Sequence, residues 1–169
     1  MAKRISKNAL FIALMCITGL ISISIQVNVK LTLQLIILLF AFAFTDKLID
    51  KIIIPLSYLI IGLFIPVFGG FQSGITPTFG FVIGFVLSAV PYHFINKTKL
   101  NFNIRYFASS VISVLTIYIV GTIFLMFYLK TELMNALLIG VLPYIIFDIA
   151  KIILVFIVIK HMPKSIIEK

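Results

Sequence analysis

Residues 107–129 read FASSVISVLTIYIVGTIFLMFYL, a stretch of 23 residues without a charged side chain. An α-helix needs about 20 mostly apolar residues to cross the hydrocarbon core of a bilayer, and this stretch exceeds that length. The whole chain has the same character, because 62% of its 169 residues are hydrophobic and only 11% are charged. Soluble domains contain about 25% charged residues. We therefore expect an integral membrane protein.

Five further apolar runs accompany this one, and polar breaks separate them. In chain order, the six runs are residues 9–25, 31–44, 52–68, 78–95, 107–129 and 133–159. The second run is short, and it reaches the length of a span only if Val27 and Val29 are included. The sequence predicts an all-α fold: an integral membrane bundle of six transmembrane helices, forming a single membrane domain over residues 1–169.

The basic residues indicate how these helices are oriented. The net charge of +9 would suggest a nucleic-acid partner in a soluble protein, but here Lys and Arg lie mainly between the apolar runs, so no nucleic acid is expected. With the N-terminus inside, eleven basic residues fall on the cytoplasmic side and two, Lys30 and Lys130, on the outer side. Cytoplasmic loops are enriched in Lys and Arg. We therefore predict a multi-pass protein of the cell membrane with both termini cytoplasmic.

Two charged residues lie inside the sixth run. Asp148 and Lys151 are three positions apart, which places them on one helix face within reach of each other. Each costs about 2.5 to 3.5 kcal/mol at the centre of a spanning helix, and an apolar residue at both positions would avoid that cost. One interpretation is that they neutralise each other while packing against a neighbouring helix. We favour a ligand site, in which one acceptor and one donor bind an amide or ureido edge.

An uncharged stretch on the outer side, residues 69–81 (GGFQSGITPTFGF), is a second candidate feature. Its early glycines and small hydroxyls allow a backbone that folds back into the bundle and covers a ligand. The alternative is a plain loop that ends in a helix cap, with Thr76 or Thr78 as the cap and Pro77 in the first turn. The two interpretations are compatible. Gln34, which is polar at membrane depth, is a further pocket candidate.

The sequence contains no recognisable catalytic or metal-binding pattern. There is no phosphate loop, nucleophile elbow or HExxH motif, and the two histidines lack metal-ligand spacing. An intramembrane acyl or lipid transferase would need a His or carboxylate cluster near an interface. Asp46 and Asp50 come nearest, but a lysine follows each, which favours a solvated, salt-bridged turn. We expect no enzyme, no catalytic residue, no metal and no ATP hydrolysis by this chain itself.

Several segments match the motifs of one known family. They are ALFIA at 9–13 for its early small-residue helix, LTLQ at 31–34 for P-x-T-x-Q, YLIIGL at 58–63 with PVFGG at 66–70 for Y-L-L-x-G-L…P-V-F-x-G-G, TPTFGFVIGF at 76–85 for G-P-T-G-G-Y-L-I-G-F, and GVLP at 140–143 with Asp148 and Lys151 for G-x-L-P…D-x-x-K. The chain thus resembles the BioY family, the biotin-binding S components of energy-coupling factor (ECF) transporters. The resemblance covers nearly the whole chain.

The resemblance implies an ECF S-component-like bundle of six helices that captures biotin from outside. It implies that Asp148 and Lys151 contact the ureido head and that the loop after the third helix closes over the ligand. It also implies that Ala9 and Ala13, a small-xxx-small pair, meet a transmembrane coupling subunit and, through it, ATP-binding subunits. The candidate ligand-binding residues are Gln34, Gln72, Thr78, Phe81, Asp148 and Lys151.

The sequence departs from the family pattern at three places. Lys30 replaces the usual proline, Phe79 a glycine and Phe81 a tyrosine, so the pocket has lost a hydroxyl and gained bulk. Biotin remains the predicted ligand, and a related small amphipathic acid such as lipoate is the alternative. Another class is also open: a membrane assembly subunit that shares the bundle but binds no ligand. Binding of biotin to the purified protein separates these classes.

Overall fold

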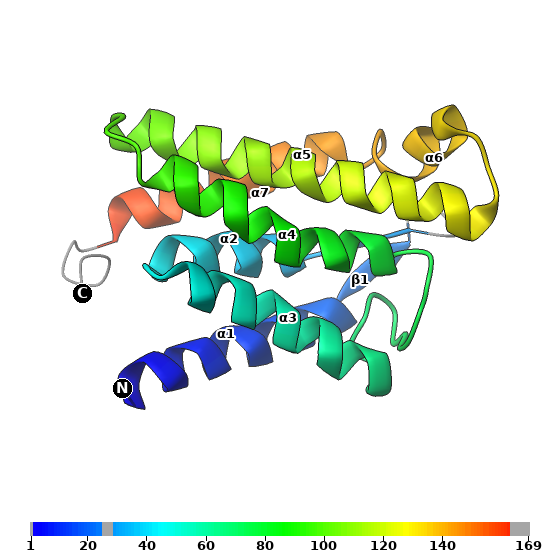
Figure 1. The fold of residues 1–169 in the computed structure, drawn as a ribbon, viewed down its shortest axis with the longest axis horizontal. Helices are drawn as coiled ribbons and strands as arrows, with labels where there is room; N and C mark the ends of the chain where they lie inside the picture. The colour runs from blue at the N-terminus through cyan, green and yellow to red at the C-terminus, as the bar shows by residue number, and fades with distance from the viewer. Residues whose placement is uncertain (1, 25–28, 163–169) are drawn as a thin grey trace.

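The computed structural model describes residues 2–24 and 29–162, which form an elongated bundle of helices (Figure 1). Two short strands pair antiparallel in a hairpin, with Ser22 opposite Thr32. The described elements, in chain order, are α1 (Ala2–Leu20), β1 (Ser22–Ser24), β2 (Lys30–Thr32), α2 (Gln34–Phe44), α3 (Leu48–Phe64), α4 (Phe79–Asn96), α5 (Phe102–Leu129), α6 (Leu133–Gly140) and α7 (Ile145–His161).

Each of the six predicted apolar runs contains a helix, which confirms the all-α membrane bundle. Among the described residues, α4 and α5 are long and apolar enough to cross a membrane on their own, and α6 with α7 make a third span if taken together. The sixth run is not one straight helix, because α6 and α7 meet at 48°. Pro143 lies in the break between them; proline lacks an N–H and disfavours a helical conformation at the preceding residue. The hairpin β1–β2 was not predicted.

The second run forms a shorter helix than a span requires. Helix α2 has 11 residues, a length of about 16 Å against a hydrocarbon core of about 30 Å. The expectation that Val29 extends this helix is wrong, because Val29 precedes strand β2; Val27 lies outside the described residues. No residue of α2 is exposed. A helix that is apolar on every side packs in the core of a bundle, so other helices, instead of lipid, surround α2.

The two longest helices, α4 and α5, lie against each other along the bundle (Figure 1). A Cβ at Gly84 of α4 would lie 2.8 Å from the Cα of Ile117 in α5, closer than real side chains approach. A residue without a side chain is therefore needed at Gly84. Ser113 adds a hydrogen bond between the helices by donating to the backbone oxygen of Ser88 at 3.2 Å. In lipid there is no hydrophobic driving force between helices, so close packing at small residues and hydrogen bonds between helices hold α4 and α5 together.

Charged residues link α1, α2 and α3 at one end of the bundle. Asp50 Oδ1 accepts hydrogen bonds from Arg4 Nε at 2.9 Å and from Asn8 Nδ2 at 2.7 Å. Lys51 Nζ donates to two backbone carbonyls at the C-terminal end of α2. Asp50 and Lys51 are only 3% and 1% exposed. The expected solvated turn is therefore wrong for these two residues, since both are buried where helices meet.

The start of α1 and the end of α7 lie at the same end of the bundle, whereas β1 and α6 lie at the opposite end (Figure 1). Because α1 starts at the end where α7 finishes, the described helices cross the bundle an even number of times. The fold thus places the segments around β2, the α3–α4 loop and α6 together, far from the start of α1 and the end of α7.

Candidate ligand-binding site

A cavity lies among the helices, and most of its polar lining comes from residues that the sequence singled out or that contact them. The cavity has a volume of about 90 Å³, enough for several water molecules and suited to a small ligand. Five of the six candidate ligand residues line the cavity, and the remaining one, Gln72, does not. The five are Gln34, Thr78, Phe81, Asp148 and Lys151.

Asp148 and Lys151 form a buried ion pair on the cavity wall. Lys151 Nζ donates to Asp148 Oδ1 at 2.7 Å, as their three-residue spacing predicts. Tyr118 of α5 donates its hydroxyl to the other carboxylate oxygen, Oδ2, at 2.6 Å. Asp148 and Lys151 are 8% and 9% exposed. We call these three residues the polar cluster; the geometry keeps its charges neutral overall while turning polar groups toward the cavity.

The break between α6 and α7 places the polar cluster. Asp148 lies in the first turn of α7, because the helix begins only at Ile145. The N-terminal end of a helix carries a partial positive charge that stabilises a carboxylate. Broken helices at membrane depth commonly end at ligand sites, since their free backbone groups then face a cavity instead of lipid. The predicted pair thus lies at a helix start instead of the middle of a continuous span.

Gln34 is the first residue of α2, and two neighbours hold its side-chain amide. Its Oε1 accepts a hydrogen bond from Thr32 Oγ1 at 3.0 Å, and its Nε2 donates to the hydroxyl of Tyr58. Tyr58 in turn donates to the backbone oxygen of Val67 at 3.2 Å. Gln34, Thr32 and Tyr58 all line the cavity. The amide is therefore fixed in one orientation before any ligand arrives.

The α3–α4 loop folds back toward the bundle, as predicted for residues 69–81. Gly74 N donates to the backbone oxygen of Gly62 at 2.9 Å, which joins the loop to α3. Gln72 exchanges backbone hydrogen bonds with Phe68, and Phe68 lines the cavity. Gln72 thus shapes the loop through its backbone. Thr78 stands at the N-cap of α4 but makes no side-chain capping bond.

Three tyrosines in the cavity wall, Tyr58, Tyr118 and Tyr144, were not among the candidate residues. Tyr144 donates its hydroxyl to the backbone oxygen of Val29, next to strand β2. Each tyrosine lies in an apolar run, and a buried tyrosine hydroxyl normally finds a hydrogen-bond partner. That rule could have marked these tyrosines as candidate polar residues of the bundle interior. It does not identify the partner of each hydroxyl, so the sequence could not assign Tyr118 to Asp148.

The small-residue pair of α1 lies away from the cavity. Ala9 and Ala13 are both exposed, one helical turn apart, whereas Asn8 is buried against α3. Neither alanine lines the cavity described above. This face of α1 is therefore free for contact with another molecule.

A second hollow, with a volume of about 600 Å³, is lined by Asp46, Arg105 and Lys160 among others. None of the candidate ligand residues lines it.

The fold and the cavity define a helical membrane protein with an internal site for a small molecule. The model of the BioY family matches residues 1–168, and the chain belongs to this family. Two curated relatives are similar: the biotin transporter BioY of Thermotoga maritima, 29% identical over 67% of this chain and 69% of its own, and a protein described as a probable biotin transporter BioY from Pyrococcus horikoshii, 32% identical over 89% and 90%.

A solved structure shares this fold. The crystal structure of the S component for biotin from an ECF-type ABC transporter matches with a TM-score of 0.81 over 95% of this chain and 90% of that one. The two sequences are 24% identical.

Proposed function

We propose that this chain is the S component of an ECF-type transporter that takes up biotin. It binds biotin from the outer side and delivers it through a complex with a transmembrane coupling subunit and ATP-binding subunits. Membership of the BioY family and the descriptions of the two relatives as biotin transporters support this function.

The observation that carries the proposal is the polar cluster on the wall of a mainly apolar cavity. A ureido ring offers two N–H donors and one carbonyl acceptor. Asp148 supplies a carboxylate that accepts from N–H groups, and Lys151 supplies an ammonium that donates to a carbonyl. The apolar wall, which includes Phe81 and Phe85, suits the sulfur ring and aliphatic tail of biotin.

Lipoate is the alternative ligand, because it shares the tail and a sulfur ring. It has no ureido group, so it cannot satisfy both partners of the buried pair. An assembly subunit without a ligand would have no need for a cavity with an ion pair in its wall, since an apolar helix face would suffice.

The exposed pair Ala9 and Ala13 is the proposed contact for the coupling subunit. Small residues let the backbone of a partner helix approach closely. Both termini are proposed to be cytoplasmic, since eleven basic residues fall on the side of the termini and only two on the opposite side.

The test is titration of the detergent-purified protein, made in cells grown without biotin, by isothermal titration calorimetry. Three ligands separate the alternatives: biotin, desthiobiotin, which keeps the ureido ring without the sulfur, and lipoate. We expect the two ureido compounds to bind and lipoate to bind at least a hundredfold more weakly. Tight lipoate binding with none of the ureido compounds would reassign the ligand, and no heat with any of them would favour the assembly subunit.

A further inference from the structure

Lys30 stands in the cavity wall at a place where the family pattern has a proline. It opens strand β2 and pairs through its backbone with Ser24 of β1. Its neighbours Leu31 and Thr32 line the same cavity, and Tyr144 holds the preceding residue, Val29, by its carbonyl. The position of Lys30 is therefore fixed by the hairpin and by the segment that leads into α7.

The lysine side chain passes over the glycine pair of the α3–α4 loop. A Cβ on Gly70 would lie 2.8 Å from Cε of Lys30, and a Cβ on Gly69 would lie 3.4 Å from its Cβ. Gly70 also has a φ of +74°, a conformation that side chains rarely adopt. Gly70 thus leaves the space that the end of the Lys30 side chain occupies. The ammonium lies over the backbone of this glycine, beside the cavity.

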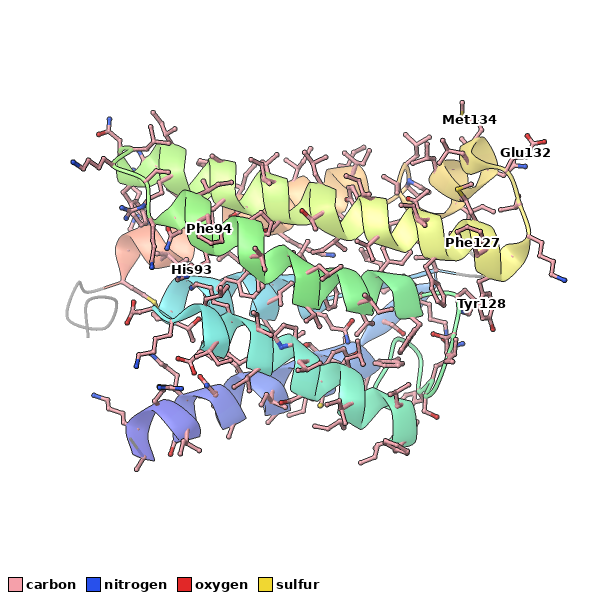
Figure 2. All side chains as sticks on the ribbon, viewed as in Figure 1. His93, Phe94, Phe127, Tyr128, Glu132 and Met134 are labelled. Atoms are coloured by element: carbon pink, nitrogen blue, oxygen red, sulfur yellow. The ribbon has the colours of Figure 1, made fainter. Side chains whose placement is uncertain are left out.

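Within the described residues, the ammonium of Lys30 has neither an ion pair nor a hydrogen bond. Asp148 is already paired with Lys151 in the polar cluster. Glu132 is exposed at the tip where α5 leads into α6, and Figure 2 shows it pointing outward from the bundle. A half-buried cation on the wall of a mainly apolar cavity thus lacks the protein counter-charge that would normally accompany it.

We propose that Lys30 binds the carboxylate of the ligand's tail while the polar cluster binds its head. This inference rests on the proposed function of the cavity, and it defines the substrate class further: a free acid, in preference to its neutral amide. One ligand would then be bound at both polar ends, with the carboxylate supplying the counter-charge that Lys30 lacks. The charge makes the contact stronger than one to a neutral amide.

The experiment compares biotin with biotinamide, whose carboxamide has nearly the same shape without the charge. Both are titrated against the wild-type protein, Lys30→Met and the matched control Lys130→Met, which removes an exposed outer lysine that does not line the cavity. We expect wild type and Lys130→Met to prefer biotin about ten- to a hundredfold, the range of one charged hydrogen bond. In Lys30→Met the preference should vanish, with biotin falling to the affinity of biotinamide.

The outcomes separate this inference from the proposed function. If Lys30→Met keeps the full preference for biotin over biotinamide, or if the wild type shows no such preference, Lys30 does not bind the carboxylate. If Lys30→Met loses both ligands equally, the residue only supports the hairpin, which also overturns the inference. In all these cases biotin still binds the wild type. Failure of the wild type to bind biotin at all would instead remove the proposed function, and this inference with it.

Discussion

Asp148 and Lys151 illustrate how a charged pair is tolerated at membrane depth. Each charge has its partner at hydrogen-bond distance, and Tyr118 occupies the second carboxylate oxygen. Removing one partner of such a pair leaves an uncompensated buried charge, whereas removing both together is often tolerated. The pair can therefore be tested only by a variant that removes both charges.

The first prediction concerns the double variant Asp148→Leu with Lys151→Leu. It should fold and lose biotin affinity by roughly two to four orders of magnitude, since each charged hydrogen bond contributes about 1.5 to 3 kcal/mol. The measurement is a biotin titration of a variant shown to be monodisperse in detergent. A triple variant that also carries Tyr118→Phe is the control for folding, because it removes the tyrosine hydroxyl that has lost its carboxylate partner. Unchanged affinity would exclude the pair from the site.

The second prediction concerns Tyr118 alone. Tyr118→Phe leaves Asp148 Oδ2 without its donor, so biotin affinity should fall about tenfold or more. The matched control is Tyr106→Phe in the same helix, which removes a hydroxyl bonded to the backbone oxygen of Ile152 at 3.1 Å and lies outside the cavity lining. Both variants lower thermal stability, but only Tyr118→Phe should weaken binding. Equal effects on affinity would mean that Tyr118 acts through general packing.

At the scale of elements, the cavity depends on irregular segments between the helices. Helix α2 is short, the sixth run is broken at Pro143, and the β1–β2 hairpin brings Lys30 and Thr32 to the cavity wall. A bundle of six uninterrupted spans would bury the same apolar surface but would offer no helix start for Asp148. The exposed face of α1, by contrast, is regular and takes no part in the cavity.

The third prediction concerns that face. Replacing Ala9 and Ala13 together by leucine should abolish biotin uptake in cells that supply the coupling proteins, because bulk keeps a partner helix at a distance. Biotin binding to the purified variant should be unchanged. Ala150→Leu on α7, another exposed alanine, is the matched control and should leave uptake intact. If binding falls in parallel with uptake, the alanines are needed only for packing within the chain.

At the scale of the whole molecule, the start of α1 and the end of α7 lie at one end of the bundle (Figure 1). Arg4 and Lys51 lie in the same end through their contacts with Asp50 and α2. The cavity, the hairpin and the α3–α4 loop lie toward the other end.

The fourth prediction concerns orientation in the membrane. The eleven-to-two distribution of basic residues predicts that a reporter fused after Lys169 is active only on the cytoplasmic side. A matched fusion inserted after Thr131, in the turn between α5 and α6, should be active only outside. A C-terminal reporter active on the outer face would reverse the proposed direction of uptake.

The sequence by itself determined the membrane class, the six apolar runs and the proximity of Asp148 to Lys151. These follow from composition and from the spacing of residues within one helix, which are local properties of the chain. The family motifs also picked out five residues that line the cavity.

Only the tertiary structure decided which residues from different helices meet. Tyr118 reaches Asp148 across 30 positions of sequence, and Asp50 is buried by contacts with α1 instead of being solvated in a turn. The short helix α2 likewise follows from its neighbours, because helices on every side remove the need to match the thickness of the bilayer. Such contacts depend on how the helices pack, and the periodicity of a single run carries no information about its partners.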